Sequence, residues 1–171
     1  IALTGVLHAI GRKGEKPAIP LNVVGDYGGG GMMLAFGLVC ALLETQQSGQ
    51  GQVVDCSIVD GVASLMGFFY SQLQAGIGSD ERGGELLDSG AFFYDVYETS
   101  DGKYVSIGSI EPQFFKELVT LLELSESESA EWMQNQWATK TWPQMADKLE
   151  ALIKTKTRDA WCDIFEGSDV C

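Results

Sequence analysis

The stretch LNVVGDYGGGGM, residues Leu21–Met32, decides the fold, together with the apolar run behind it. Four consecutive glycines follow Asp26, and such a run is expected where the backbone approaches another group closely or adopts a positive φ. Residues Met32–Gln47 are apolar on nearly every face, which predicts a buried helix. We therefore expect a short extended segment that leads into the glycines, and a helix that begins within Gly28–Gly31.

The rest of the first half follows the same alternation. Glycines at 49 and 51 predict the end of that helix. Gln52–Cys56 is expected to form a short strand, and Val59–Ala75 a second, largely apolar helix. Residues 1–11 are apolar with small side chains and predict a helix. Strands alternating with helices indicate an α/β architecture.

The second half predicts a small α+β domain with a hairpin and helices. Residues 76–90 contain five glycines and a charged run, which is typical of a linker. Ser100–Gly102 carries an Asp-Gly pair between two aromatic-rich segments, the signal of a tight hairpin. Glu111–Pro112 predicts the start of a helix that reaches Leu122. Residues 125–131 are expected to form a break between helices. A further helix is expected at 142–154. The last helix is expected to begin with a cap at 157–159 and to continue through residue 165.

Composition limits the function classes. The chain has 171 residues, 45% of them apolar, and a formal net charge of −13. Residues 1–60 hold five acidic and three basic side chains, and residues 61–171 hold nineteen and eight. So acidic a surface repels nucleic acids and anionic lipid heads. The longest apolar stretch, Met32–Leu43, falls short of the roughly 20 residues of a membrane span, so no transmembrane helix is expected.

Four cysteines lack the spacing of a metal or redox motif, so we expect reduced thiols and no metal site. The chain has no initiator Met and begins within an apolar segment, which predicts an internal fragment of a longer protein.

Local sequence patterns indicate two carboxylates that could take part in catalysis or binding. Asp26 stands before a glycine-rich helix start, where backbone N–H groups and the helix dipole favour a phosphate, a carboxylate or an enolate oxygen. The alternative is that Asp26 caps the helix and the glycines allow close packing. Glu111 lies between the hairpin and the next helix, where it could equally well only complement the helix dipole.

Other candidates have structural interpretations. His8, the single histidine, lies in an apolar helix-like run and is predicted to be structural rather than catalytic. Asp55 and Asp60 flank a predicted turn and are interpreted as caps. The four tryptophans, at 132, 137, 142 and 161, are predicted to anchor the core of the small domain.

At Leu21–Met32, and again at GQGQVVD (49–55) and IEPQF (110–114), the sequence resembles the family III CoA-transferase (CaiB/BaiF-type) superfamily. The resemblance covers nearly the whole chain. Within that superfamily it looks most like the racemases, isomerases that interconvert 2-methyl-branched (α-methylacyl) acyl-CoA thioesters by removing and returning the α-proton. The resemblance implies an enolate intermediate, with coenzyme A as part of the substrate and without metal or redox cofactor.

The resemblance also implies an architecture. Residues 1–75 would be the C-terminal part of a Rossmann-like, CoA-binding large domain, 76–90 a linker and 91–171 the small domain. Two subunits would interlock as a homodimer. Asp26 matches one of the two catalytic bases and Glu111 the small-domain glutamate. Gly28, Gly29 and Gly30, with Ile58, are candidates for substrate binding. The second base, a histidine, would lie before Ile1, so we expect little or no activity from this chain alone.

Two other functions stay open. The first is CoA transfer, in which Asp26 attacks a thioester as a nucleophile. Glu111 in its IEPQF motif favours racemisation, because the transferases of the superfamily carry a glycine-rich loop near that position. The second is a non-catalytic interaction module with an acidic docking surface. A racemase of this kind would be cytoplasmic in a bacterium, and peroxisomal or mitochondrial in a eukaryote. Its partner would be an acyl-CoA, with neither nucleic acid nor membrane.

Overall fold

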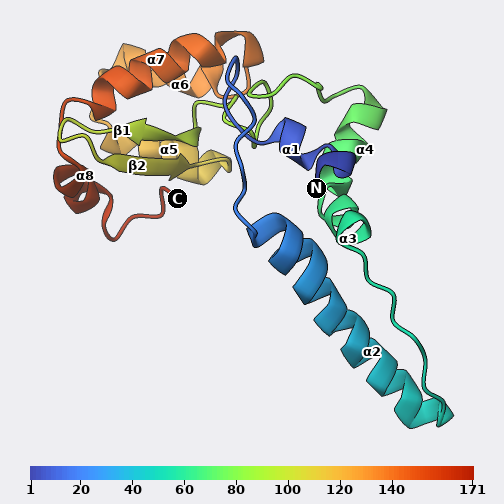
Figure 1. Cartoon of the computed structure of the whole chain (residues 1–171). Helices are drawn as coiled ribbons and strands as arrows, with labels where there is room; N and C mark the ends of the chain where they lie inside the picture. Colours follow the sequence, from blue (N-terminus) through green and yellow to red (C-terminus); the bar gives the residue numbers. More distant parts are fainter. The chain divides into compact units, whose positions relative to one another are not determined.

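The computed structural model describes all residues, 1–171, as two compact units, Ile1–Gly83 and Gly84–Cys171. Figure 1 shows their elements along the chain. The boundary lies within the glycine-rich segment 76–90. The regular elements of the first unit are all helical. They are a 3₁₀ turn (Ala2–Thr4), α1 (Val6–Ala9), a π-helix (Val23–Met32), α2 (Met33–Ser48), α3 (Ile58–Leu65) and α4 (Gly67–Ala75).

The glycine-rich stretch is helical from Val23 onward, so the predictions of an extended segment and of a helix start within Gly28–Gly31 are wrong. Asn22 is the N-cap, and the N–H of Tyr27 donates to the Asn22 carbonyl at 3.1 Å. This five-residue spacing is that of a π-helix. Such helices are rare in proteins, and those that occur are often found at functional sites. The π-helix continues into α2, whose predicted end at Gly49 is confirmed by a left-handed φ of 72°.

The π-helix and α3 meet backbone to backbone at Gly29 and Gly61, which are both buried. A Cβ built on Gly61 would lie 1.8 Å from the Gly29 carbonyl oxygen, and one built on Gly29 would lie 2.5 Å from Val62 Cγ2. Val62 belongs to the buried cluster of this unit, with Val6 and Met66. No side chain fits between the two helices, so close packing explains the glycines at these two positions.

Helix α2 is not buried within the chain, contrary to the prediction. None of its residues is fully buried, and its large exposed side chains include Phe36, Leu38 and Leu42. With the π-helix it forms a 26-residue helical stretch, Val23–Ser48, with mean hydropathy 1.4, long and apolar enough by length and composition to cross a membrane. The prediction of no such helix counted only Met32–Leu43. Since no other element covers α2, its apolar surface stays open in the isolated chain.

The predicted strand Gln52–Cys56 is also wrong. Residues 49–57 form an irregular segment that runs back along α2 (Figure 1), where Val54 packs beside Gly37. A strand requires a neighbour for its N–H and C=O groups, and the first unit contains none. The predicted helix Val59–Ala75 is present as two helices, α3 and α4, that meet at the buried Met66.

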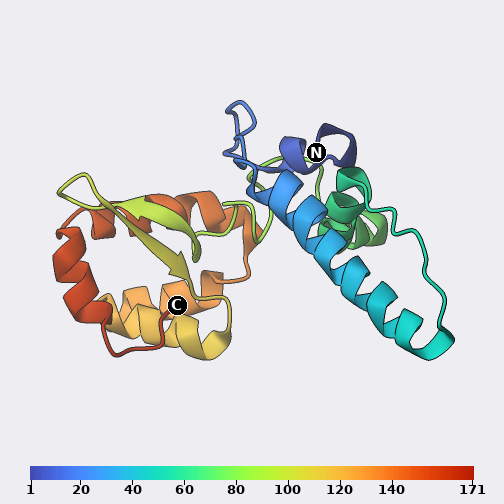
Figure 2. The ribbon, with the colours of Figure 1, turned by 60° about the horizontal axis from the view of Figure 1, so that its bottom comes forward.

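The second unit surrounds an antiparallel hairpin with helices, as Figure 2 shows. Its strands are β1 (Tyr94–Glu98) and β2 (Tyr104–Gly108), paired from Tyr94↔Gly108 to Glu98↔Tyr104. The predicted turn is confirmed: the Gly102 N–H donates to the Thr99 carbonyl at 3.0 Å, and Gly102 has φ 71°. The helices are α5 (Pro112–Leu121), α6 (Glu126–Asn135), α7 (Trp142–Ile153) and α8 (Arg158–Phe165), with a 3₁₀ turn at Thr139–Thr141.

Helix α6 occupies most of the segment that was predicted to be a break. Its signal was local, because Ser125 and Glu128 form a capping box in which each side chain meets the other's backbone N–H. The segment was predicted to be a break because it is strongly acidic, although it contains this capping pattern. Helices α5, α7 and α8 lie where they were predicted, each within one residue at both ends.

Aromatic rings form the core of the second unit. Phe93 packs edge-to-face against Phe115, Trp137 and Trp142 with ring centroids 5.4–5.8 Å apart, a favoured geometry for aromatic pairs. Trp132, Trp142 and Trp161 are buried, as predicted, but Trp137 is 55% exposed and lies at the edge of the core.

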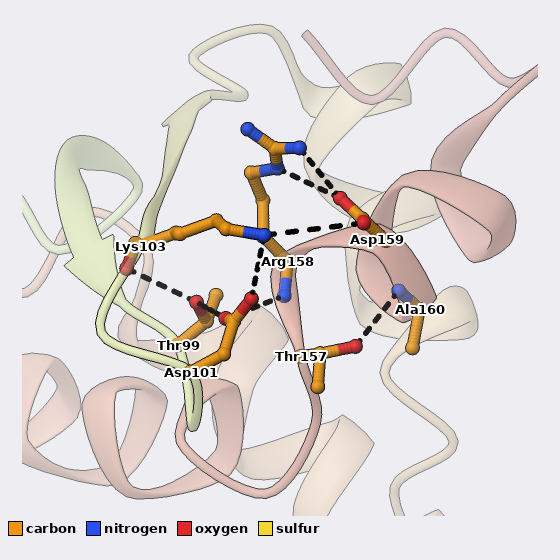
Figure 3. A network of polar contacts seen from close by, with 7 residues as sticks. All are labelled: Thr99, Asp101, Lys103, Thr157, Arg158, Asp159 and Ala160. Atoms are coloured by element: carbon orange, nitrogen blue, oxygen red, sulfur yellow. Dashed lines mark hydrogen bonds and ion pairs between the residues drawn. The ribbon is translucent and has the colours of Figure 1, made fainter.

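A polar network joins the hairpin turn to the start of α8 (Figure 3). One oxygen of Asp101 accepts hydrogen bonds from the Thr99 hydroxyl at 2.6 Å and the Arg158 N–H at 3.1 Å. The other lies 3.0 Å from Lys103 Nζ. These contacts, led by the Thr99 hydroxyl, hold the pKa of Asp101 well below its usual range. Thr157 caps α8, as predicted, by accepting the Ala160 N–H.

Gly61→Ala should destabilise the first unit, because the new methyl group would overlap the Gly29 carbonyl. Overpacking of this kind costs about 1–3 kcal/mol. Gly67→Ala is the matched control, since a Cβ at Gly67 meets nothing within 4 Å at the start of α4. Urea unfolding followed by far-UV circular dichroism compares the two. Equal stability of both variants would refute the contact.

Asp101→Asn should lower the urea midpoint at neutral pH. A lowered pKa of Asp101 in the folded state means that the ionised carboxylate stabilises the fold above its ordinary pKa of 3.8. That contribution is lost as the pH falls below this value, so the difference from the parent should shrink at about pH 3. Asp147→Asn, at an exposed position of α7, is the control. A deficit as large at pH 3 as at neutral pH would contradict the assignment.

Candidate functional site

Asp26 lies in the first turn of the π-helix. Its side chain is exposed, and its carboxylate forms no hydrogen bond or ion pair with the rest of the chain. The N–H groups from Val23 to Asp26 precede the first helical hydrogen bond and have no partner within the helix. An uncommitted carboxylate thus lies beside the positive end of a 26-residue helical stretch.

The glycines predicted to bind substrate lie along α3. Cβ atoms built on Gly28, Gly29 and Gly30 would lie 3.4 Å from Leu65, 2.5 Å from Val62 and 3.1 Å from Ile58, respectively. The structure therefore brings Ile58 and Gly30 together. The glycine N–H groups lie within the helical hydrogen-bond pattern rather than at its free end, which belongs to Val23–Asp26. The substrate-binding role of the three glycines and Ile58 stays a prediction.

Glu111 is the N-cap of α5, with Pro112 as the first helical residue. Its backbone is extended (φ −69°, ψ 144°), and its side chain accepts no capping hydrogen bond. The residue is exposed, and its carboxylate is unpaired within the second unit. Like Asp26, Glu111 therefore offers an anionic group without a structural partner. The two residues lie in different units.

The backbone before Glu111 is held by a residue that the sequence analysis did not single out. Gln136, at the end of α6, is buried and donates from its side-chain amide to the Ile110 carbonyl. No local pattern marks this glutamine, because its partner lies 26 residues away in the sequence.

Of the other candidates, His8 and Asp60 have structural roles, whereas the cap predicted at Asp55 is absent. His8 Nε2 donates to the Asp80 carbonyl at 2.8 Å, which fixes the position of the ring in the first unit. The cap of α3 is Ser57 rather than Asp60, and the Asp60 carboxylate accepts the Ser57 hydroxyl at 2.6 Å. Asp55 lies exposed in the irregular segment before α3 and caps no helix.

An open pocket of about 370 Å³ lies at one end of the hairpin. Tyr94, Val96 and Ser106 line it, together with Cys171. None of the predicted site residues lines this pocket. The chain contains no cluster of three or more His, Cys, Asp or Glu side chains that could hold a metal ion.

Comparisons with known proteins agree with these motifs. The sequence profile described as CoA-transferase family III matches residues 1–171. The chain is 43% identical over 171 residues to an α-methylacyl-CoA racemase of Mus musculus and 41% identical to that of Homo sapiens. Each match covers all of this chain and 44% of the relative, so the chain spans less than half of their length.

A solved structure shares the fold. The crystal structure of a CAIB/BAIF family protein from Brucella suis superposes with a TM-score of 0.70 at 21% sequence identity. The match covers 98% of this chain and 44% of the other. At this identity the likeness concerns the fold alone, which is helix-rich with a small antiparallel hairpin.

Proposed function

Because the chain belongs to CoA-transferase family III, we propose that it supplies two carboxylates of an acyl-CoA racemase. The reaction is the interconversion of (R)- and (S)-2-methylacyl-CoA thioesters, with coenzyme A entering only as part of the substrate. The observation that carries this proposal is the 43% identity with a racemase across the whole chain, which includes both uncommitted carboxylates.

Asp26 acts as one of the two bases. Removal of the α-proton breaks a C–H bond and leaves the electron pair delocalised onto the thioester carbonyl oxygen. Asp26 takes the proton on one face of the planar enolate, and a second group must return one on the other face. We assign that second group to a histidine outside residues 1–171.

The free end of the π-helix supports this role. Its unpaired N–H groups at Val23–Asp26 are hydrogen-bond donors that could meet the developing negative charge on the carbonyl oxygen. Glu111 does not act as a base in this scheme. Its carboxylate orients the second base by a hydrogen bond.

CoA transfer is the second candidate, and the name of the family favours it. There the Asp26 carboxylate would attack the thioester carbonyl, and the thiolate of coenzyme A would leave. A non-catalytic interaction module is the third candidate, and it would move neither a proton nor coenzyme A. Product analysis separates these functions, because only a transferase moves coenzyme A to a free acid.

The exposed surface of α2 supports an assembly. We propose that the first unit is part of a Rossmann-like large domain and that a second subunit covers α2 in an interlocked homodimer. Large apolar surfaces seldom stay open to water in a monomer. The length and hydropathy of Val23–Ser48 would also suit a bilayer, but the Gly29–Gly61 contact commits its first part to α3.

Size-exclusion chromatography with light scattering tests the assembly. The chain should elute as a dimer or larger species, because burial of α2 removes its apolar side chains from water. Phe36→Glu, at an exposed position of α2, should shift the population toward monomer, whereas Gln46→Glu, near the end of the same helix, should not. A monomeric parent that floats with liposomes would favour the membrane instead.

Deuterium exchange tests the reaction. The probe is a chimera in which this chain replaces the matching segment of the mouse racemase. The chimera should exchange the α-proton of both 2-methylacyl-CoA enantiomers with solvent. Asp26→Asn should lower the rate by about 10²–10⁴-fold, since the amide cannot accept the proton, and Glu111→Gln should have a milder effect.

Asp55→Asn, an exposed carboxylate of the same unit, is the control and should exchange normally. Near-normal exchange by Asp26→Asn on both enantiomers would rule out Asp26 as a base. Transfer of coenzyme A to a free acid, without exchange, would identify a transferase.

A further inference from the structure

Gln136 is a buried amide at the end of α6, with 3% of its surface exposed. Its Nε2 lies 2.9 Å from the Ile110 carbonyl oxygen and 3.5 Å from the Ser109 carbonyl oxygen. A primary amide has two N–H donors, so one group can serve both carbonyls. The backbone of Gln136 is held in turn, because Trp142 Nε1 donates to its carbonyl at 2.8 Å.

The two carbonyls belong to the turn that leads directly to Glu111. In this turn the Ile110 N–H donates to the Gly108 carbonyl at 2.9 Å. The Ser109 hydroxyl is buried and donates to the Val170 carbonyl. Pro112 follows Glu111 and fixes the first residue of α5. The Glu111 backbone is therefore constrained from both sides, while its carboxylate stays unpaired.

We propose that Gln136 is a positioning residue for Glu111, an inference that rests on the proposed racemase function. The amide sets the direction of the Ser109–Ile110 peptide groups, and with it the direction in which the Glu111 side chain leaves the backbone. The Glu111 carbonyl accepts the Phe115 N–H at 3.0 Å, but the Glu111 carboxylate has no hydrogen bond in the second unit, so the direction of the side chain depends on the backbone turn beneath it. Gln136 itself is buried in the second unit and touches neither proton nor thioester.

Gln136→Met tests this role, because methionine has a similar length and no hydrogen-bond donor. In the isolated chain, the Ile110 amide should exchange with solvent at least about tenfold faster, since the turn opens more often. In the chimera with the mouse racemase, kcat for α-proton exchange should fall about tenfold or more, because small displacements of a catalytic group are costly. KM should stay within about twofold of the parent value, because no binding contact is removed.

A double-mutant comparison separates positioning from general stability. If Gln136 acts through Glu111, then Gln136→Met should change kcat by less than about twofold in a Glu111→Gln background. Ile153→Val, a conservative change in the same core, should lower thermal stability without changing kcat or Ile110 exchange. If Gln136→Met does not fold, Gln136→Asn keeps the amide, shortens its reach and is measured in the same way.

The outcomes are distinguishable. An active parent whose Gln136→Met variant keeps normal kcat, or normal Ile110 exchange, would overturn the positioning role and leave the racemase proposal intact. Equal losses in the parent and Glu111→Gln backgrounds would also overturn it, because they would show a purely structural effect. A parent chimera without α-proton exchange would overturn the proposed function and the positioning role with it.

Discussion

Backbone contact between Gly29 and Gly61 is the constraint on which the first unit depends. Helices normally pack 8–10 Å apart, separated by their side chains. Here a single methyl group on Gly61 would overlap a carbonyl oxygen, so the two helices touch directly. Glycine in a helix is unfavourable by about 1 kcal/mol relative to alanine. Tertiary packing must therefore compensate the unfavourable helix propensity of the four glycines at 28–31. This packing places Asp26 about one turn before the contact, at the free end of the helix.

The second unit is stabilised by side-chain packing and buried hydrogen bonds rather than by backbone contact between helices. Edge-to-face aromatic pairs fill its core, and buried donors fix its chain reversals, as Gln136 does at the Ser109–Ile110 carbonyls. An unpaired buried carbonyl costs about 1–3 kcal/mol, so such donors select one backbone conformation. The rigidity of the turn and the freedom of the Glu111 carboxylate are thus compatible, since they involve different atoms of neighbouring residues.

Structural features that depend on residues close in the sequence could be predicted, whereas features that depend on contacts between distant residues could not. The Asp-Gly turn, Pro112 at a helix start and the Thr157 cap act within four residues, and the structure contains all three. The π-helix depends on α3, some thirty residues away, so its glycines were assigned to an extended segment and a helix start. Gln52–Cys56 has the composition of a strand but no neighbouring strand with which to pair. Burial of α2 would require another element to pack against its apolar side chains, and no element of this chain does so.

The start of α5 differs from the capped starts of three other helices. Helices α3, α6 and α8 each begin at a Ser or Thr whose side chain accepts a backbone N–H. Helix α5 begins at Glu111, a residue type outside the preferred caps, and its carboxylate makes no capping bond. Stability alone would favour Ser, Thr, Asp or Asn there. Helices α4 and α7 also begin without a side-chain cap, at Met66 and Thr141, so a missing cap does not by itself mark a functional residue. What distinguishes Glu111 from these caps is the IEPQF motif in which it lies, together with a carboxylate that the fold does not use.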